Sequence, residues 1–113
     1  VAEARALSLE TGADVEAYYD IETQGTGFAS SRYFENRVPR MREGDFSALF
    51  MLRFMLKDAR LARDMTDRID AYPMLSSVIA SFEEAEASGH GDDDFSAVMK
   101  ALEDRLGVAI KRD

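Results

Sequence analysis

Lys57 and Asp58 are adjacent ionisable residues within an otherwise apolar helical stretch, residues 46–63, which reads FSALFMLRFMLKDARLAR. A charge held against a packed surface is strongly unfavourable unless it is paired or bound. Asp58 follows Phe54 by four residues and precedes Leu61 by three, which places it on the apolar face of a helix. There its carboxylate either accepts a buried hydrogen bond between helices or orients groups beside a ligand. Lys57 falls on the polar side, where a solvated lysine is the ordinary interpretation.

The pair belongs to a long helix that the pattern predicts from about Leu49 to Asp70. Its polar stripe repeats at intervals of three and four residues and consists of Arg53, Lys57, Arg60, Asp64 and Asp67. Its apolar face includes Phe50, Phe54, Leu61 and Met65. Further apolar residues widen this surface nearly all round the first turns, which predicts a central helix contacted on several sides.

The N-terminal part of the chain predicts shorter helices. Residues 1–11 are rich in alanine and leucine, and Gly12 follows where a left-handed residue ends a helix. Asp14 is placed to cap a second helix over 15–23. The glycines at 25–27 should end that helix.

A third helix should begin near Ser30 and Ser31, which both offer caps, and should reach Arg37. Pro39 disfavours helical geometry in the residue before it, so we expect a break or a kink there. A short helical turn over 40–43 should follow.

The C-terminal part predicts two more helices. Pro73 suits the first turn of a helix that runs to about Ala87, and the glycines at 89–91 should end it. Asp94 is placed to cap a last helix over 95–106. No segment alternates with a period of two over a strand's length. We therefore expect an all-α fold of about six helices packed around the long helix.

The bulk composition excludes several classes of function. A net charge of −8 argues against nucleic acid and anionic membranes as partners, because both reward excess Lys and Arg. The chain has no cysteine and one histidine, which excludes disulfides and multi-histidine metal sites. The acids of GHGDDDFS at 89–96 lack calcium-loop spacing, so no metal site is expected. No apolar run suits a membrane span and no signal peptide is visible, so we expect a cytoplasmic protein.

Several stretches together resemble one known family, the β-hydroxyacid dehydrogenases, which include 3-hydroxyisobutyrate dehydrogenase and are related to 6-phosphogluconate dehydrogenase. The long helix contains FMLRFMLKDARLA, and GHGDDDFSAVMKAL follows it. Upstream stand AEARALSLETGADVE and GFASSRYFENRVPRM, in the order of the family's C-terminal domain. Each motif is short, but their order and spacing are specific and cover nearly the whole chain.

The resemblance implies a two-domain oxidoreductase whose N-terminal Rossmann domain binds NAD or NADP. Hydride passes between the nicotinamide and the carbinol carbon of a small hydroxy acid, and the helical C-terminal domain closes the cleft. Lys57 matches the family lysine that contacts the cofactor, and Phe50 matches an aromatic residue close to the nicotinamide. Asp58 matches the aspartate that helps to hold the site.

The resemblance assigns no catalytic residue to this chain. The family's catalytic lysine, its general acid and base, lies upstream of the position that matches Val1. The glycine-rich nucleotide fingerprint and the loop that binds the substrate carboxylate are also missing. We therefore expect residues 1–113 to be a single helical domain, the C-terminal part of a longer two-domain enzyme. Alone it should be inactive and should bind no NAD or NADP.

Helical pattern begins at Val1 with no capping residue before it, as in a helix cut in two, although a removed tag would look the same. The expected partners are the Rossmann domain of the same parent chain and further copies in a homo-oligomer. An alternative hypothesis is a free-standing helical protein-interaction module without catalysis. A reading frame that continues upstream with a nucleotide fingerprint would distinguish the two.

Overall fold

A computed structural model describes residues 2–23 and 31–109. Its α-helices and short helical turns are α1 (Ala2–Glu10), α2 (Val15–Thr23), α3 (Arg32–Glu43), α4 (Leu52–Asp64), η1 (Ile69–Ala71), α5 (Pro73–Ala85), η2 (Glu86–His90), η3 (Phe95–Ala97) and α6 (Val98–Leu106). The elements η1 and η3 are 3-10 turns, and η2 is a π-helical turn. The predicted all-α fold is confirmed.

The chain divides into two compact units. Unit 1 comprises Val1–Asp45 and Leu102–Asp113, and unit 2 comprises Phe46–Ala101. Every residue assigned to the candidate site belongs to unit 2. Among the described residues, no helix is both long enough and apolar enough to cross a bilayer.

The predicted caps of unit 1 are confirmed wherever the structure describes them. Gly12 has a φ of 73°, and the Asp14 carboxylate accepts hydrogen bonds from the main-chain N–H groups of Glu16 and Ala17. Ser31 caps α3 by accepting a hydrogen bond from the N–H of Phe34. The predicted break at 25–27 and the alternative cap at residue 30 lie outside the described residues.

Of the break or kink predicted at Pro39, the break is wrong, because α3 continues through this residue to Glu43 and includes the turn predicted over 40–43. Proline has no N–H, so the helix lacks the hydrogen bond that this N–H would donate. Two features compensate. Val38 and its neighbours on one side of α3 are buried, and Gly44, at φ 72°, donates its N–H to the carbonyls at the helix end.

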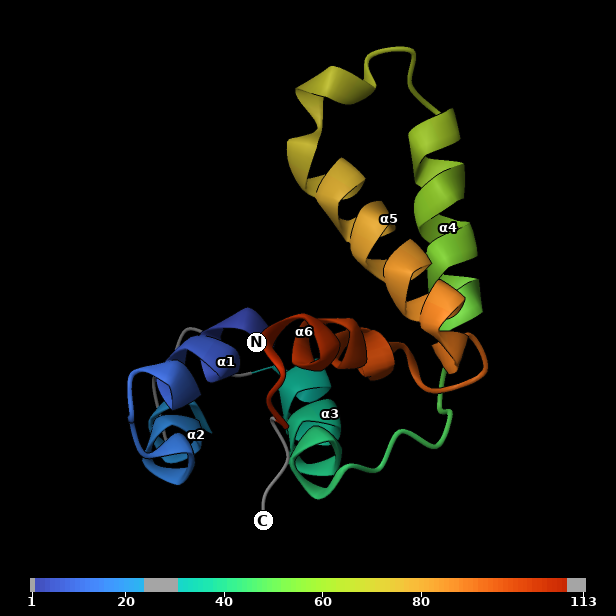
Figure 1. Cartoon of the computed structure of the whole chain (residues 1–113). Coiled ribbons are helices and arrows are strands. Elements are labelled where there is room, and N and C mark those ends of the chain that lie inside the picture. The colour runs from blue at the N-terminus through green and yellow to red at the C-terminus, as the bar shows by residue number, and fades with distance from the viewer. Residues whose placement is uncertain (1, 24–30, 110–113) are drawn as a thin grey trace. The chain divides into compact units, whose positions relative to one another are not determined.

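Unit 2 is built on α4 and α5, which lie side by side as an antiparallel hairpin (Figure 1). Pro73 occupies the first turn of α5, as predicted. Leu52 and Leu56 of α4 are completely buried. The core of unit 2 consists of these two residues with Ile79, Phe82, Ala85, Ala97 and Ala101.

Helix α4 is shorter than the sequence predicts, spanning Leu52–Asp64 instead of about 49–70. It begins late because the main chain before it bonds to a distant segment, with the N–H of Leu52 donating to the carbonyl of Asp93. It ends early, and the Thr66 hydroxyl then accepts a hydrogen bond from the N–H of Arg68. Such local side-chain bonds compete with helical hydrogen bonds.

Candidate functional site

One side of α4 carries an exposed row of apolar side chains. Phe50 is 38% exposed, Phe54 is 47% exposed and Leu61 is 55% exposed. The prediction that this side of the helix is packed is therefore wrong. The packed side carries Leu52 and Leu56, which point the opposite way at the helical rotation of about 100° per residue.

We call the exposed side the open face of α4. It comprises Phe54, Lys57, Asp58 and Leu61 of α4, together with Phe50 just before the helix and Met65 just after it. The rings of Phe50 and Phe54 meet edge to face, with centroids 6.1 Å apart and planes at 64°. An exposed apolar row of this extent is typical of a surface that meets a partner or a ligand.

Lys57 and Asp58 lie in the middle of the open face and pair with each other. The distance from Lys57 Nζ to Asp58 Oδ1 is 2.9 Å, and the two side chains are 62% and 51% exposed. The predicted burial of Asp58 is wrong, and so is the interpretation that it makes a buried hydrogen bond between helices. An exposed pair of this kind contributes little to folding, so its charges remain available to a ligand.

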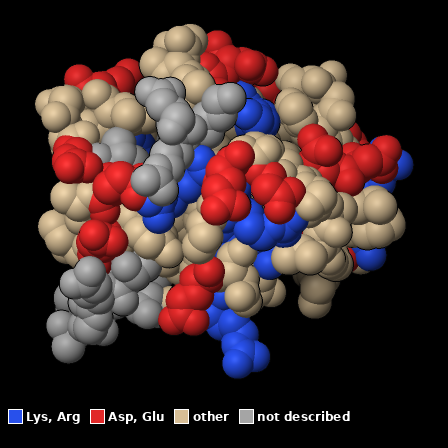
Figure 2. Space-filling model, turned by 90° about the horizontal axis from the view of Figure 1, so that it is seen from below, with Lys and Arg blue, Asp and Glu red and all other residues tan. Residues whose placement is uncertain are grey.

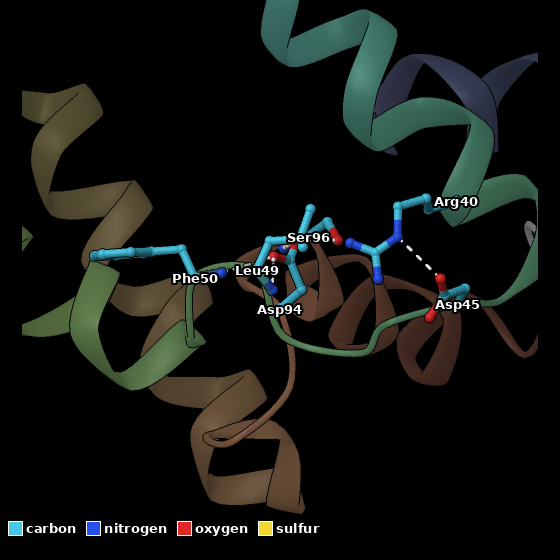
Figure 3. A network of polar contacts seen from close by, with 6 residues as sticks. All are labelled: Arg40, Asp45, Leu49, Phe50, Asp94 and Ser96. Atoms are coloured by element: carbon cyan, nitrogen blue, oxygen red, sulfur yellow. Dashed lines mark hydrogen bonds and ion pairs between the residues drawn. The ribbon is translucent and has the colours of Figure 1, made fainter.

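The buried carboxylate of unit 2 belongs to Asp94, which is completely buried. Its Oδ2 accepts hydrogen bonds from the main-chain N–H groups of Leu49 and Phe50, both at 3.1 Å. Its Oδ1 accepts from the N–H of Ser96 at 3.2 Å and from the Ser96 hydroxyl at 2.7 Å. Figure 3 shows the three partners gathered around Asp94, while the ring of Phe50 points away. The separate Arg40–Asp45 ion pair in this view belongs to unit 1.

Main-chain hydrogen bonds join the same two segments. They link Asp94 N to Phe46 O, Phe95 N to Phe50 O, Leu52 N to Asp93 O and Arg53 N to Gly91 O, at 2.8 to 3.0 Å. The residues before α4 are therefore held by the loop after α5. This connection fixes where the open face begins.

The hydrogen bonds of Asp94 also determine its ionisation. Burial alone would raise the pKa of this carboxyl, but the bond from the Ser96 side chain and the main-chain bonds from Phe50, Ser96 and Leu49 outweigh it and lower the pKa. Asp94 is therefore ionised at neutral pH. The sequence predicted Asp94 as the cap of a helix over 95–106, and in the structure it caps η3, the turn that leads into α6. Its bonds to Leu49 and Phe50 were not predicted, because no local pattern reports a contact across more than forty residues.

Asp94 belongs to the loop of residues 89–96, which reads GHGDDDFS. His90 is half-buried, and its Nδ1 lies 2.7 Å from Asp93 Oδ2. Arg53 of α4 pairs with the exposed Asp92 at 2.8 Å. Among the residues that the structure describes, no group of histidine and acidic side chains is arranged to hold a metal ion.

Surface charge is mixed where it can be seen. On the face in Figure 2, basic side chains are flanked by acidic ones. The net charge of −8 therefore coexists with local ion pairs such as Arg60–Glu83, at 2.8 Å, which links α4 to α5.

The chain belongs to the family described as the NAD-binding domain of NADP-dependent 3-hydroxyisobutyrate dehydrogenase, whose model matches residues 1–102. The family predicted from the sequence is thus confirmed. The matched range contains Phe50, Lys57 and Asp58, and it also contains Asp94.

Individual relatives agree with this assignment. The chain is 41% identical over 101 residues to an L-threonate dehydrogenase of Cupriavidus necator, covering 88% of this chain and 33% of that protein. An L-threonate dehydrogenase of Haemophilus influenzae is 36% identical, with coverages of 98% and 36%. The crystal structure of a 3-hydroxyisobutyrate dehydrogenase from Salmonella typhimurium superimposes with a TM-score of 0.72 at 31% identity, covering 88% of this chain and 34% of that one. The chain spans about a third of the length of these relatives.

Proposed function

We propose that this chain is the helical C-terminal domain of an NAD(P)-dependent dehydrogenase that acts on a small hydroxy acid. The observation that carries the proposal is the open face of α4, where a lysine lies among exposed aromatic and aliphatic side chains. In a family that binds NAD or NADP, such a face suits a dinucleotide held by a separate nucleotide-binding domain.

Three residues of the open face have separate roles in this proposal. Lys57 supplies a mobile cation for the polar or phosphate groups of the cofactor, and Asp58, 2.9 Å away, orients it. Phe50, in edge contact with Phe54, forms an apolar wall beside the nicotinamide. The cofactor, when bound, supplies hydride chemistry at the carbinol carbon of the substrate. The chain's own contribution is to bind and orient the cofactor and to exclude water from it.

The general acid and base of the reaction belongs to the preceding part of the parent enzyme, as the family resemblance implies. We therefore expect purified residues 1–113 to show no turnover with NAD, NADP and any small hydroxy acid. Turnover by this chain alone would contradict the proposal, because it would require a proton-transfer group that the proposal does not include.

A chimera tests the positive half of the proposal. The C-terminal part of the Cupriavidus necator L-threonate dehydrogenase would be replaced by this chain at the 101 matched residues. We expect the chimera to oxidise L-threonate with the cofactor of its host, whereas the host truncated before the junction should be inactive. A chimera that is folded but shows no turnover, whatever its oligomeric state, would count against the proposal.

A homo-oligomer is the second expected assembly. The end of the α4–α5 hairpin exposes Met65, Tyr72, Met74 and Val78. We expect this apolar area to drive self-association of the isolated chain. A strictly monomeric mass in light scattering at high concentration would contradict this expectation. A chain that self-associates but never completes a dehydrogenase would instead support the alternative of a helical interaction module.

A further inference from the structure

We propose that Asp94 is a positioning residue, whose buried carboxylate fixes the main chain at Leu49 and Phe50 and so places the Phe50 ring for the cofactor. Asp94 itself touches neither substrate nor cofactor in this scheme. The inference rests on the proposed function, in which the open face of α4 binds the cofactor.

The first ground is the geometry of the two carboxylate oxygens. Oδ1 is occupied by Ser96, which is all that capping of η3, the turn that leads into α6, requires. Oδ2 is directed to a different segment, where it accepts hydrogen bonds from the N–H groups of Leu49 and Phe50. These two residues precede α4, so no helical carbonyl is available to their N–H groups.

Another capping aspartate of the same chain shows that the second set of bonds is additional. Asp14 caps α2 through Oδ1 alone, which accepts hydrogen bonds from the N–H groups of Glu16 and Ala17. Asp14 remains exposed. Asp94 is completely buried and uses both oxygens. Burying a carboxylate is unfavourable, so a cap alone does not explain the placement of Asp94.

The second ground is the position of the Asp94 carboxylate relative to the ring of Phe50. In Figure 3 the N–H of Phe50 faces Asp94 and its ring extends away from the carboxylate. The carbonyl of Phe50 is held as well, by the N–H of Phe95 at 2.8 Å. With both main-chain groups fixed, the direction of the side chain is set by a single rotatable bond from Cα.

The first arm of the test uses the 113-residue chain and amide hydrogen exchange. Asp94→Ala should accelerate exchange at Leu49 and Phe50 by about tenfold or more. Asp94→Asn keeps one acceptor oxygen without charge, and it should accelerate exchange by about threefold even if Asp94→Ala fails to fold. The matched control is Asp92→Asn, the same substitution at a carboxylate that is 71% exposed, and it should leave both amides unchanged. Unchanged exchange in Asp94→Asn would overturn the inference.

The second arm uses the chimera and separates positioning from simple stability. Asp94→Asn should raise KM for the cofactor at least about threefold at a temperature where the protein is fully folded, and Asp92→Asn should not. A lower fraction of folded protein with an unchanged KM would reduce Asp94 to a structural residue and overturn the inference. The proposed function fails separately, if the unsubstituted chimera has no turnover, and the inferred role toward the cofactor then fails with it.

Discussion

The two sides of α4 carry similar apolar residues in opposite situations. Leu52 and Leu56 are fully buried against the rest of unit 2, whereas Phe54 and Leu61 are about half exposed on the open face. Burial of a large aliphatic side chain stabilises a fold by roughly 2 kcal/mol, and an exposed one contributes far less. The contrast indicates that one side of α4 holds unit 2 together, whereas the other contributes little to its core and is the side that we propose meets a partner.

The largest expected effect separates the two sides by their contribution to folding. Leu56→Ala should lower the free energy of unfolding by about 3 kcal/mol, because it leaves a cavity in a closed core. Phe54→Ala removes a larger side chain and should lower it by less than about 1 kcal/mol. Urea denaturation of the 113-residue chain measures both. Equal losses would mean that the open face is also part of the folded core.

A smaller effect concerns the pH dependence of the stability that Asp94 contributes. The pKa of Asp94 is lowered by folding, so its ionised form adds stability at pH values above the unfolded pKa of about 3.9. That contribution is lost as the pH falls through the lower pKa of the folded state. The stability difference between the wild type and Asp94→Asn should therefore be constant near neutrality and shrink below about pH 4. A difference that grows on acidification would contradict the assignment.

The smallest effect lies at the border between the two sides. Arg60 pairs with Glu83 of α5 at 2.8 Å, and both side chains are more than 40% exposed. Arg60→Ala should change the free energy of unfolding by about 0.5 kcal/mol or less, and added salt should remove even that. A loss comparable to that of Leu56→Ala would show that the packed side extends further round α4 than the burial of its residues indicates.

Local patterns in the sequence predicted much of this fold. The caps at Asp14, Ser31 and Asp94 and the first-turn Pro73 depend on neighbouring residues, and each is confirmed. The break before Pro39 was predicted from an equally local rule and is wrong, because packing and the Gly44 cap keep α3 continuous.

The candidate site could be predicted only in part. Periodicity correctly placed Phe54 and Asp58 on one side of α4. The first turns of α4 are apolar nearly all round, however, and periodicity does not say which side meets the protein's own core. Asp58 was therefore assigned to a packed surface, although it is exposed. The buried carboxylate is Asp94, and its bonds to the residues before α4 arise from tertiary structure.

The central claim is that the open face of α4 meets the cofactor through Lys57. The chain contains a matched control, because Arg63 pairs with Asp64 at 3.0 Å just as Lys57 pairs with Asp58 at 2.9 Å on the same helix. The decisive measurement is KM for the cofactor in the chimera carrying Lys57→Ala or Arg63→Ala, at matched stability. We predict that Lys57→Ala raises KM about tenfold and that Arg63→Ala leaves it within about twofold. An unchanged KM in Lys57→Ala, or equal rises in both variants, would contradict the account.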